Sequence, residues 1–144
     1  MKAVMLTENG IEFREVELGA LSRDWARIRV VKAGLCGSDI AKISAPSLPA
    51  WHTRILGHEF YGEIIELGGP SEHVSVGDRV VVMPLLPCGS CEACGRGQEN
   101  LCVHGQAIGR TVQGAFAEFV DAPITNIVRI SSSSQLELES YALV

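Results

Sequence analysis

Short runs of alternating or β-branched residues, separated by turn residues, recur along most of the chain. In Arg27-Ile28-Arg29-Val30, charged and apolar residues alternate with a period of two, as expected for a strand with one face toward solvent. The same patterns predict strands at residues 2–6, 11–16, 26–32, 61–67, 79–83, 117–121 and 126–130. We therefore expect a mainly β protein.

Turn residues separate these strands, and the chain contains 15 glycines. The clearest turns are Gly68-Gly69-Pro70 and Gly77-Asp78, and the second leads directly into the apolar run Val80-Val81-Val82. Only short helices are expected between the strands, such as one at residues 40–43 with Asp39 as its N-cap.

The last residues follow a different pattern. Ser134 precedes Glu137 by three positions, which is a capping-box spacing, and apolar residues follow at 136, 138, 141 and 144. We predict that residues 1–130 form one domain and that residues 131–144 form a linker and the start of a helix.

Composition narrows the class of protein. The chain has 144 residues, 47% of them hydrophobic, which suits one compact domain. Twelve Lys and Arg against 17 Asp and Glu give a net charge of -5, and no basic cluster carries aromatic residues, so nucleic acid is not an expected partner. The longest apolar run, near residues 80–86, is interrupted by Pro84, and the N-terminus soon turns polar. A cytoplasmic protein with no membrane segment is expected.

Four of the five cysteines lie in one loop, within residues 84–103. Cys88, Cys91, Cys94 and Cys102 follow the pattern C-x2-C-x2-C-x7-C. Because cytosolic thiols stay reduced, this spacing favours metal binding over disulfides. Four thiolates satisfy a tetrahedral zinc ion and leave no open position, so the predicted site is structural.

An iron–sulfur cluster is the alternative for this loop. Bacterial ferredoxins also use C-x2-C-x2-C, but their fourth cysteine follows after three residues and precedes proline. Here seven residues intervene and Val103 follows Cys102. Disulfides, free thiols and an electron-transfer role for the loop remain as further alternatives.

A second group of residues suits a catalytic metal. Cys36 lies in Gly34-Leu35-Cys36-Gly37-Ser38-Asp39, and His58 and Glu59 follow about twenty residues later. A catalytic zinc needs about three protein ligands and one open position, where it lowers the pKa of a bound alcohol. Ser38 is placed to relay the alcohol proton, and Asp39 to accept the second ring N–H of His58. Taken singly, each of these residues is more often explained by packing or turn chemistry.

Several motifs together resemble the zinc-dependent medium-chain alcohol dehydrogenase family. They are Gly34-Leu35-Cys36-Gly37-Ser38-Asp39, Gly57-His58-Glu59, Val76-Gly77-Asp78-Arg79-Val80, the four-cysteine lobe and Gly114-Ala115-Phe116-Ala117-Glu118-Phe119. The resemblance covers nearly the whole chain. It implies a GroES-like, partly open β-barrel with short helices and a zinc-binding loop, followed in the family by a Rossmann domain.

The resemblance also implies the role of each site residue. Cys36 and His58 match catalytic zinc ligands, Glu59 a carboxylate that ligates or approaches the metal, Ser38 the relay hydroxyl and Asp39 the partner of the histidine. Cys88, Cys91, Cys94 and Cys102 match the structural zinc site. NAD or NADP is the implied cofactor, but no G-x-G-x-x-G follows a strand here, so a Rossmann domain is absent from this chain.

The substrate class rests on resemblance as well. The stretch Met83-Pro84-Leu85-Leu86-Pro87-Cys88, together with Cys36-Gly37-Ser38-Asp39, is similar to sorbitol and galactitol-phosphate dehydrogenases. This implies oxidation of a secondary alcohol in a polyol, its phosphate or an aminocyclitol to a ketone. Trp51 and His52 are candidates to line the pocket, with exposed loop positions as the alternative.

Two functions from different classes follow. The first is the catalytic domain of an NAD(P)-dependent dehydrogenase, inactive without its cofactor domain and oligomeric in its full-length form. The second is a free-standing, zinc-stabilised GroES-like binding module without catalysis. Cys36, Ser38, Asp39 and His58 together favour the first, because a binding module needs no open metal site with a proton relay.

Overall fold

The computed structural model describes residues 1–44 and 53–130. Strands dominate this part of the chain, and each predicted strand is present with bounds shifted by a few residues. The strands are β1 (Lys2–Thr7), β2 (Gly10–Glu15), β3 (Trp25–Gly34), β4 (Arg54–Ile55), β5 (Glu59–Leu67), β6 (Arg79–Val82), β7 (Leu85–Leu86), β8 (Gln106–Ala107), β9 (Phe119–Pro123) and β10 (Ile127–Arg129). The predictions for Trp51, His52 and residues 131–144 lie outside the described residues.

The helices of the described residues are short. They are α1 (Gly37–Ile43), α2 (Glu92–Gly95) and the 3₁₀ helices η2 (Glu99–Leu101) and η3 (Ile124–Asn126). None of them is long and apolar enough to cross a lipid bilayer.

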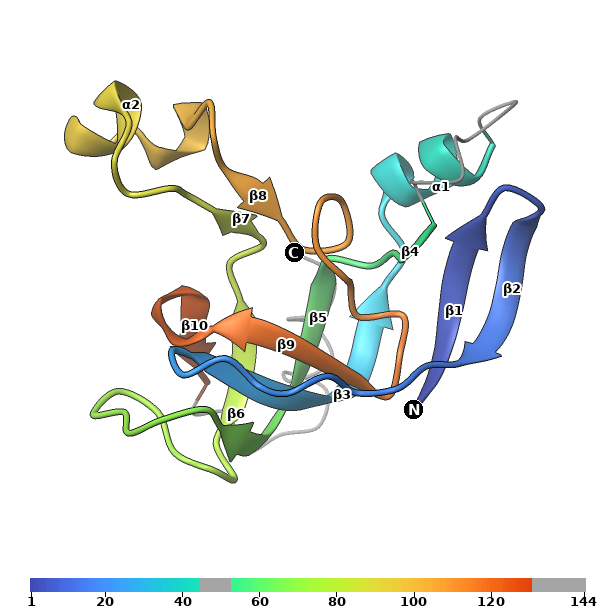
Figure 1. Cartoon of the computed structure of the whole chain (residues 1–144), viewed down its shortest axis with the longest axis horizontal. Helices are drawn as coiled ribbons and strands as arrows, with labels where there is room; N and C mark the ends of the chain where they lie inside the picture. Colours follow the sequence, from blue (N-terminus) through green and yellow to red (C-terminus); the bar gives the residue numbers. More distant parts are fainter. Residues whose placement is uncertain (45–52, 131–144) are drawn as a thin grey trace.

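The strands form three sheets (Figure 1). The largest has the order β10-β6-β5-β3-β9, and its neighbouring strands are antiparallel. A second sheet has the order β2-β1-β4, and β7 pairs with β8 in the third. The register of β3 against β5 shifts twice, between Arg27 and Ile28 and between Val30 and Lys32. Such bulges bend and twist a strand, which lets the sheet curve around a core.

The segment before β9 links the two larger sheets. Ala3 of β1 bridges Ala117, the Val4 N–H donates to the Phe116 carbonyl at 2.7 Å, and the Glu118 N–H donates to the Lys2 carbonyl at 3.1 Å. β1 therefore continues the surface that β9 begins, and the sheets wrap into a partly open barrel, as predicted.

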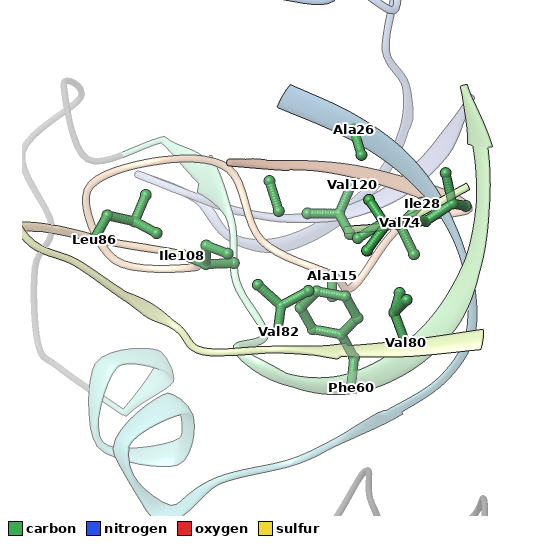
Figure 2. Packing of buried hydrophobic residues seen from close by; sticks show 12 residues of the cluster. Ala26, Ile28, Phe60, Val74, Val80, Val82, Leu86, Ile108, Ala115 and Val120 are labelled. Carbon is green, nitrogen blue, oxygen red and sulfur yellow. The ribbon is translucent and has the colours of Figure 1, made fainter. Parts of the chain in front are cut away.

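The apolar core lies inside this curved sheet (Figure 2). Its fully covered side chains include Ile28 on β3, Ile64 on β5 and Val80 on β6, each with an exposed fraction of 0%. Ile108 and Ala115 enter from the loops that precede β9. Residues from Ala26 to Ala122 thus share one core, so segments that lie far apart in the sequence pack together.

The prediction that the charged residues of β3 face solvent is wrong at one position. Arg27 is buried, and its guanidinium makes two bonds of 2.9 and 3.0 Å to Asp121 on β9. It also donates to Glu66 on β5 at 3.1 Å and to the Gly19 carbonyl at 2.8 Å. The alternation is real, but the segment around Gly19 covers Arg27, and the arginine ties the neighbouring strands β5, β3 and β9 together.

Candidate metal centres

The first candidate centre lies where β3 ends and β5 begins. Cys36 follows β3 and precedes α1, whereas His58 immediately precedes β5 and Glu59 is its first residue. One ligand atom from each of these three residues lies within 4.8 Å of the other two. The structure therefore brings together the sulfur, nitrogen and oxygen donors that the sequence singled out. This mixed set is typical of a catalytic zinc site, with room for a fourth ligand.

Asp39 lies behind the histidine. Its carboxylate is fully buried, and Oδ1 lies 3.6 Å from Nδ1 of His58. That oxygen has no hydrogen-bond partner among the described residues. A buried carboxylate oxygen without a donor is costly, and a protonated Nδ1 of His58 is the donor within reach. Such a bond would fix the histidine tautomer and leave Nε2 free for a metal.

Asp39 is not the N-cap of the helix, which corrects the prediction. α1 begins at Gly37 with Cys36 as its N-cap, so Asp39 is the third helical residue. Its Oδ2 accepts the backbone N–H of Cys36 at 3.3 Å. One carboxylate therefore positions two of the three candidate ligands: it accepts the backbone N–H of Cys36 and faces the ring of His58.

The loop before His58 is held by close backbone packing. Gly57 has φ +91°, and a Cβ built on it would lie 2.6 Å from a ring carbon of Phe116. The N–H groups of Ala115 and Phe116 donate to the carbonyls of Gly57 and Leu56, each at 2.9 Å. The motif from Gly114 to Phe119 thus supports the loop that carries His58, which accounts for its glycines and small residues.

A cavity of about 270 Å³ opens beside His58. Ser38, an exposed residue of α1, lies on its wall together with the histidine. Other parts of the wall come from Leu85, Ile108 and Arg110, which are distant from α1 in the sequence. The predicted relay hydroxyl therefore faces the space where a ligand of the first centre would lie.

The second candidate centre is the cysteine lobe, which projects beyond β7 and β8 (Figure 1). Sulfur separations are 4.0 Å for Cys88 and Cys94, 3.5 Å for Cys91 and Cys94, and 3.8 Å for Cys91 and Cys102. Sulfurs placed about 2.3 Å from one tetrahedral ion are about 3.8 Å apart. These separations are far too long for a disulfide bond.

The local surroundings shift the pKa values of two lobe thiols in opposite directions. The backbone N–H and hydroxyl of Ser90, with the N–H of Cys91, lower the pKa of Cys88 to about 5. Burial and the neighbouring thiols raise the pKa of Cys94 to about 12. The N–H of Cys88 also donates to the sulfur of Cys102 at 3.3 Å. The loop thus directs amides toward sulfur, as expected for a zinc site, while the crowded sulfur of Cys94 needs a cation to ionise.

Two residues of the cavity wall, Lys42 and Arg110, are not among the predicted site residues. Lys42 follows Ser38 by four positions, so the helical period would have placed it on the same face. For Arg110 the sequence offers no signal, because only the folded chain brings residues 107–110 against α1.

Residues 22–132 match the family model of the alcohol dehydrogenase GroES-like domain. This match covers more than half of the chain, so the chain belongs to that family. The predicted family of zinc-dependent medium-chain alcohol dehydrogenases and the predicted mainly β, GroES-like fold are confirmed.

Three relatives show how much of a family member this chain spans. An uncharacterized zinc-type alcohol dehydrogenase-like protein of Haemophilus influenzae is 36% identical over 132 residues, covering 90% of this chain and 39% of that protein. The crystal structure of galactitol-1-phosphate dehydrogenase from Escherichia coli superposes with a TM-score of 0.86 at 29% identity, covering 99% of this chain and 41% of that chain. A short chain alcohol dehydrogenase of E. coli CFT073, complexed with NADH, gives a TM-score of 0.84 at 32% identity, with 92% and 39% covered. The chain thus spans about two fifths of these relatives.

Proposed function

We propose that this chain is the zinc-binding catalytic part of an NAD(P)-dependent dehydrogenase that oxidises a secondary alcohol of a polyol or polyol phosphate to a ketone. In this proposal residues 1–130 are the catalytic domain and residues 131–144 lead to a nicotinamide-binding domain. The NADH complex of one structural neighbour and the short span of this chain on its relatives support this division.

The observation that carries the proposal is the orphaned, buried Oδ1 of Asp39 facing His58, within a set of three different donors. The donor set fits zinc, with Cys36, His58 and Glu59 as the residues that would hold it. Bound there, zinc would supply a Lewis acid that lowers the pKa of the substrate hydroxyl. The four thiols of the cysteine lobe fit a second, structural zinc.

In the proposed reaction, side chains of this chain orient the histidine, relay the proton and exclude water. Asp39 holds the Nδ1 proton of His58, which keeps Nε2 directed away from the core. The exposed Oγ of Ser38 accepts the proton that the substrate hydroxyl loses and passes it to solvent. The apolar wall beside them, formed by Leu85 and Ile108, limits the access of water to the reacting carbon.

The competing function, a binding module stabilised by the cysteine lobe alone, leaves the buried Oδ1 of Asp39 beside His58 unexplained. Burying a carboxylate beside an imidazole costs free energy that a purely structural module would avoid by an apolar residue. The spacing of the lobe thiols also disfavours an iron–sulfur cluster, since thiolates that bind separate iron atoms lie farther apart.

The cellular setting belongs to the same proposal. Four unpaired thiols suit the cytoplasm, where they stay reduced and available for metal. Leu101 and Val103 on the lobe are exposed apolar residues, and they support a homo-oligomeric full-length protein because such residues gather at interfaces.

Metal content tests the proposal directly. The purified chain should hold about two zinc ions, and His58→Ala should remove one of them without unfolding the barrel. His73→Ala, at an exposed turn, is the matched control and should retain both ions. In the protein that includes its nicotinamide-binding domain, His58→Ala should lower the rate of alcohol oxidation by at least about a hundredfold. Equal metal content in His58→Ala and the unmodified chain would contradict the assignment.

A further inference from the structure

The cavity beside His58 has a charged wall. Its lining includes Lys42 from α1 and Arg110 from the loop after β8, and no carboxylate of the described residues contributes to it. The chain as a whole carries a net charge of -5, so this is a local positive region on an acidic protein. A concave site with one sign of charge concentrates ligands of the opposite sign.

Lys42 is fixed in place rather than free in solvent. It is half-buried in the last turn of α1, and its Nζ donates to the Gly109 carbonyl at 3.3 Å. That bond uses one of the three ammonium protons and places the charge next to Arg110. The remaining N–H donors of Lys42 are available to a ligand in the cavity.

The positive charge is only partly compensated. Burial lowers the pKa of Lys42, Asp39 opposes this shift, and the positive charges of Arg110 and Arg54 lower the pKa further. The exposed guanidinium of Arg110 has no ion pair among residues 1–44 and 53–130. Like charges held together around a cavity repel one another, and a bound anion would relieve that repulsion.

We propose that the substrate carries an anionic group, a phosphate ester or a carboxylate, and that Lys42 and Arg110 bind it. This inference rests on the proposed function, because it places the reacting hydroxyl at Ser38 and His58 in the same cavity. Arg110 offers a planar fork that matches two oxygens, and Lys42 offers a point charge. The cavity, at about 270 Å³, suits a small polyol rather than a long chain.

Binding of three small probes to the zinc-loaded 144-residue chain tests this inference. Calorimetric titration of glycerol 3-phosphate, D-glycerate and glycerol measures how much an anionic group adds to polyol binding. We expect at least one of the two anions to bind about tenfold more tightly than glycerol. The tighter anion identifies the group as phosphate or carboxylate, and equal affinity for all three probes would overturn the proposal.

Charge-removing variants locate the binding groups. Lys42→Gln and Arg110→Gln should each weaken binding of the preferred anion about tenfold and change glycerol binding less than about twofold. Lys42→Arg should retain most of the affinity. Lys2→Gln and Arg23→Gln, at exposed positions outside the cavity, are the matched controls. An equal loss in the controls, or an equal loss for glycerol, would refute the assignment.

The phosphates of a dinucleotide cofactor are the other anions that Lys42 and Arg110 could bind. Titration with ADP-ribose distinguishes this role from substrate binding. If ADP-ribose binds more tightly than both polyol anions and loses affinity in Lys42→Gln, the pair serves the cofactor and the substrate proposal fails. Metal analysis of the same samples separates the two hypotheses: one zinc per chain with intact anion binding would contradict only the proposed function. Two zinc ions without anion preference would contradict only this inference.

Discussion

A single residue, Asp39, contacts two of the three candidate ligands of the first centre. Its buried carboxylate accepts the N–H of Cys36 and faces Nδ1 of His58. We expect Asp39→Asn to lower zinc affinity at this centre about tenfold to a hundredfold, because the histidine loses the charge that orients it. Competition titration with a chromogenic chelator measures the two zinc affinities separately.

The zinc-free protein provides the internal check on Asp39. An unpaired buried charge is removed by Asp39→Asn, so the free energy of unfolding without zinc should stay constant or rise. Asp24→Asn, in the exposed turn before β3, should alter neither quantity. A large loss of stability with unchanged zinc affinity would show that Asp39 serves only to cap α1.

Two thiols of the cysteine lobe should respond differently to pH. The pKa of Cys88 is lowered to about 5, so its reactive thiolate is present above that pH and is lost as pH falls through it. The pKa of Cys94 is raised to about 12, so its thiolate is scarce at neutral pH. In the zinc-free chain, iodoacetamide should modify Cys88 at a nearly constant rate from about pH 8 to 6, and Cys94 much more slowly. Peptide mass spectrometry quantifies both, and equal rates would contradict the described arrangement.

Among the secondary-structure elements, β3 shows best what a pattern can and cannot predict. Its alternation identifies a strand, but the buried position of Arg27 depends on Asp121 and Gly19, which the pattern does not relate to it. The short strands β4, β7 and β8 give no periodic signal because two residues are too few to alternate. The ligand motifs, in contrast, are local and could be predicted from the sequence.

The two arginines of β3 allow a matched stability test. Arg27 is buried and bonds to Asp121, Glu66 and the Gly19 carbonyl, whereas Arg29 pairs with Glu63 at 2.9 Å and has half of its side chain exposed. Arg27→Ala should lower the free energy of unfolding by about 2–3 kcal/mol, since it leaves Asp121 without its partner between strands. Arg29→Ala should lower it by less than about 1 kcal/mol. Urea denaturation of the zinc-loaded variants measures both, and similar losses would contradict the role of burial.

At the scale of the whole molecule, the barrel and the cysteine lobe differ in what stabilises them. The barrel has a continuous apolar core, but no residue from Pro87 to Ala107 is buried. We therefore expect the lobe to depend on a bound metal rather than on packing. The sequence predicted the lobe and the barrel, but not the cavity between α1 and the loop after β8, because its wall is assembled from segments about seventy residues apart.

This difference predicts a local response to loss of zinc. Chelation, or Cys91→Ala, should greatly increase amide hydrogen exchange across the lobe, because its hydrogen bonds are exposed once the thiolates are released. Amides of β3 and β5 at the centre of the large sheet should keep most of their protection, since their core does not include the lobe. Exchange detected by mass spectrometry on zinc-loaded and chelated samples resolves the two regions. If β3 and β5 lose protection together with the lobe, the metal stabilises the whole domain and the barrel is not an independent folding unit.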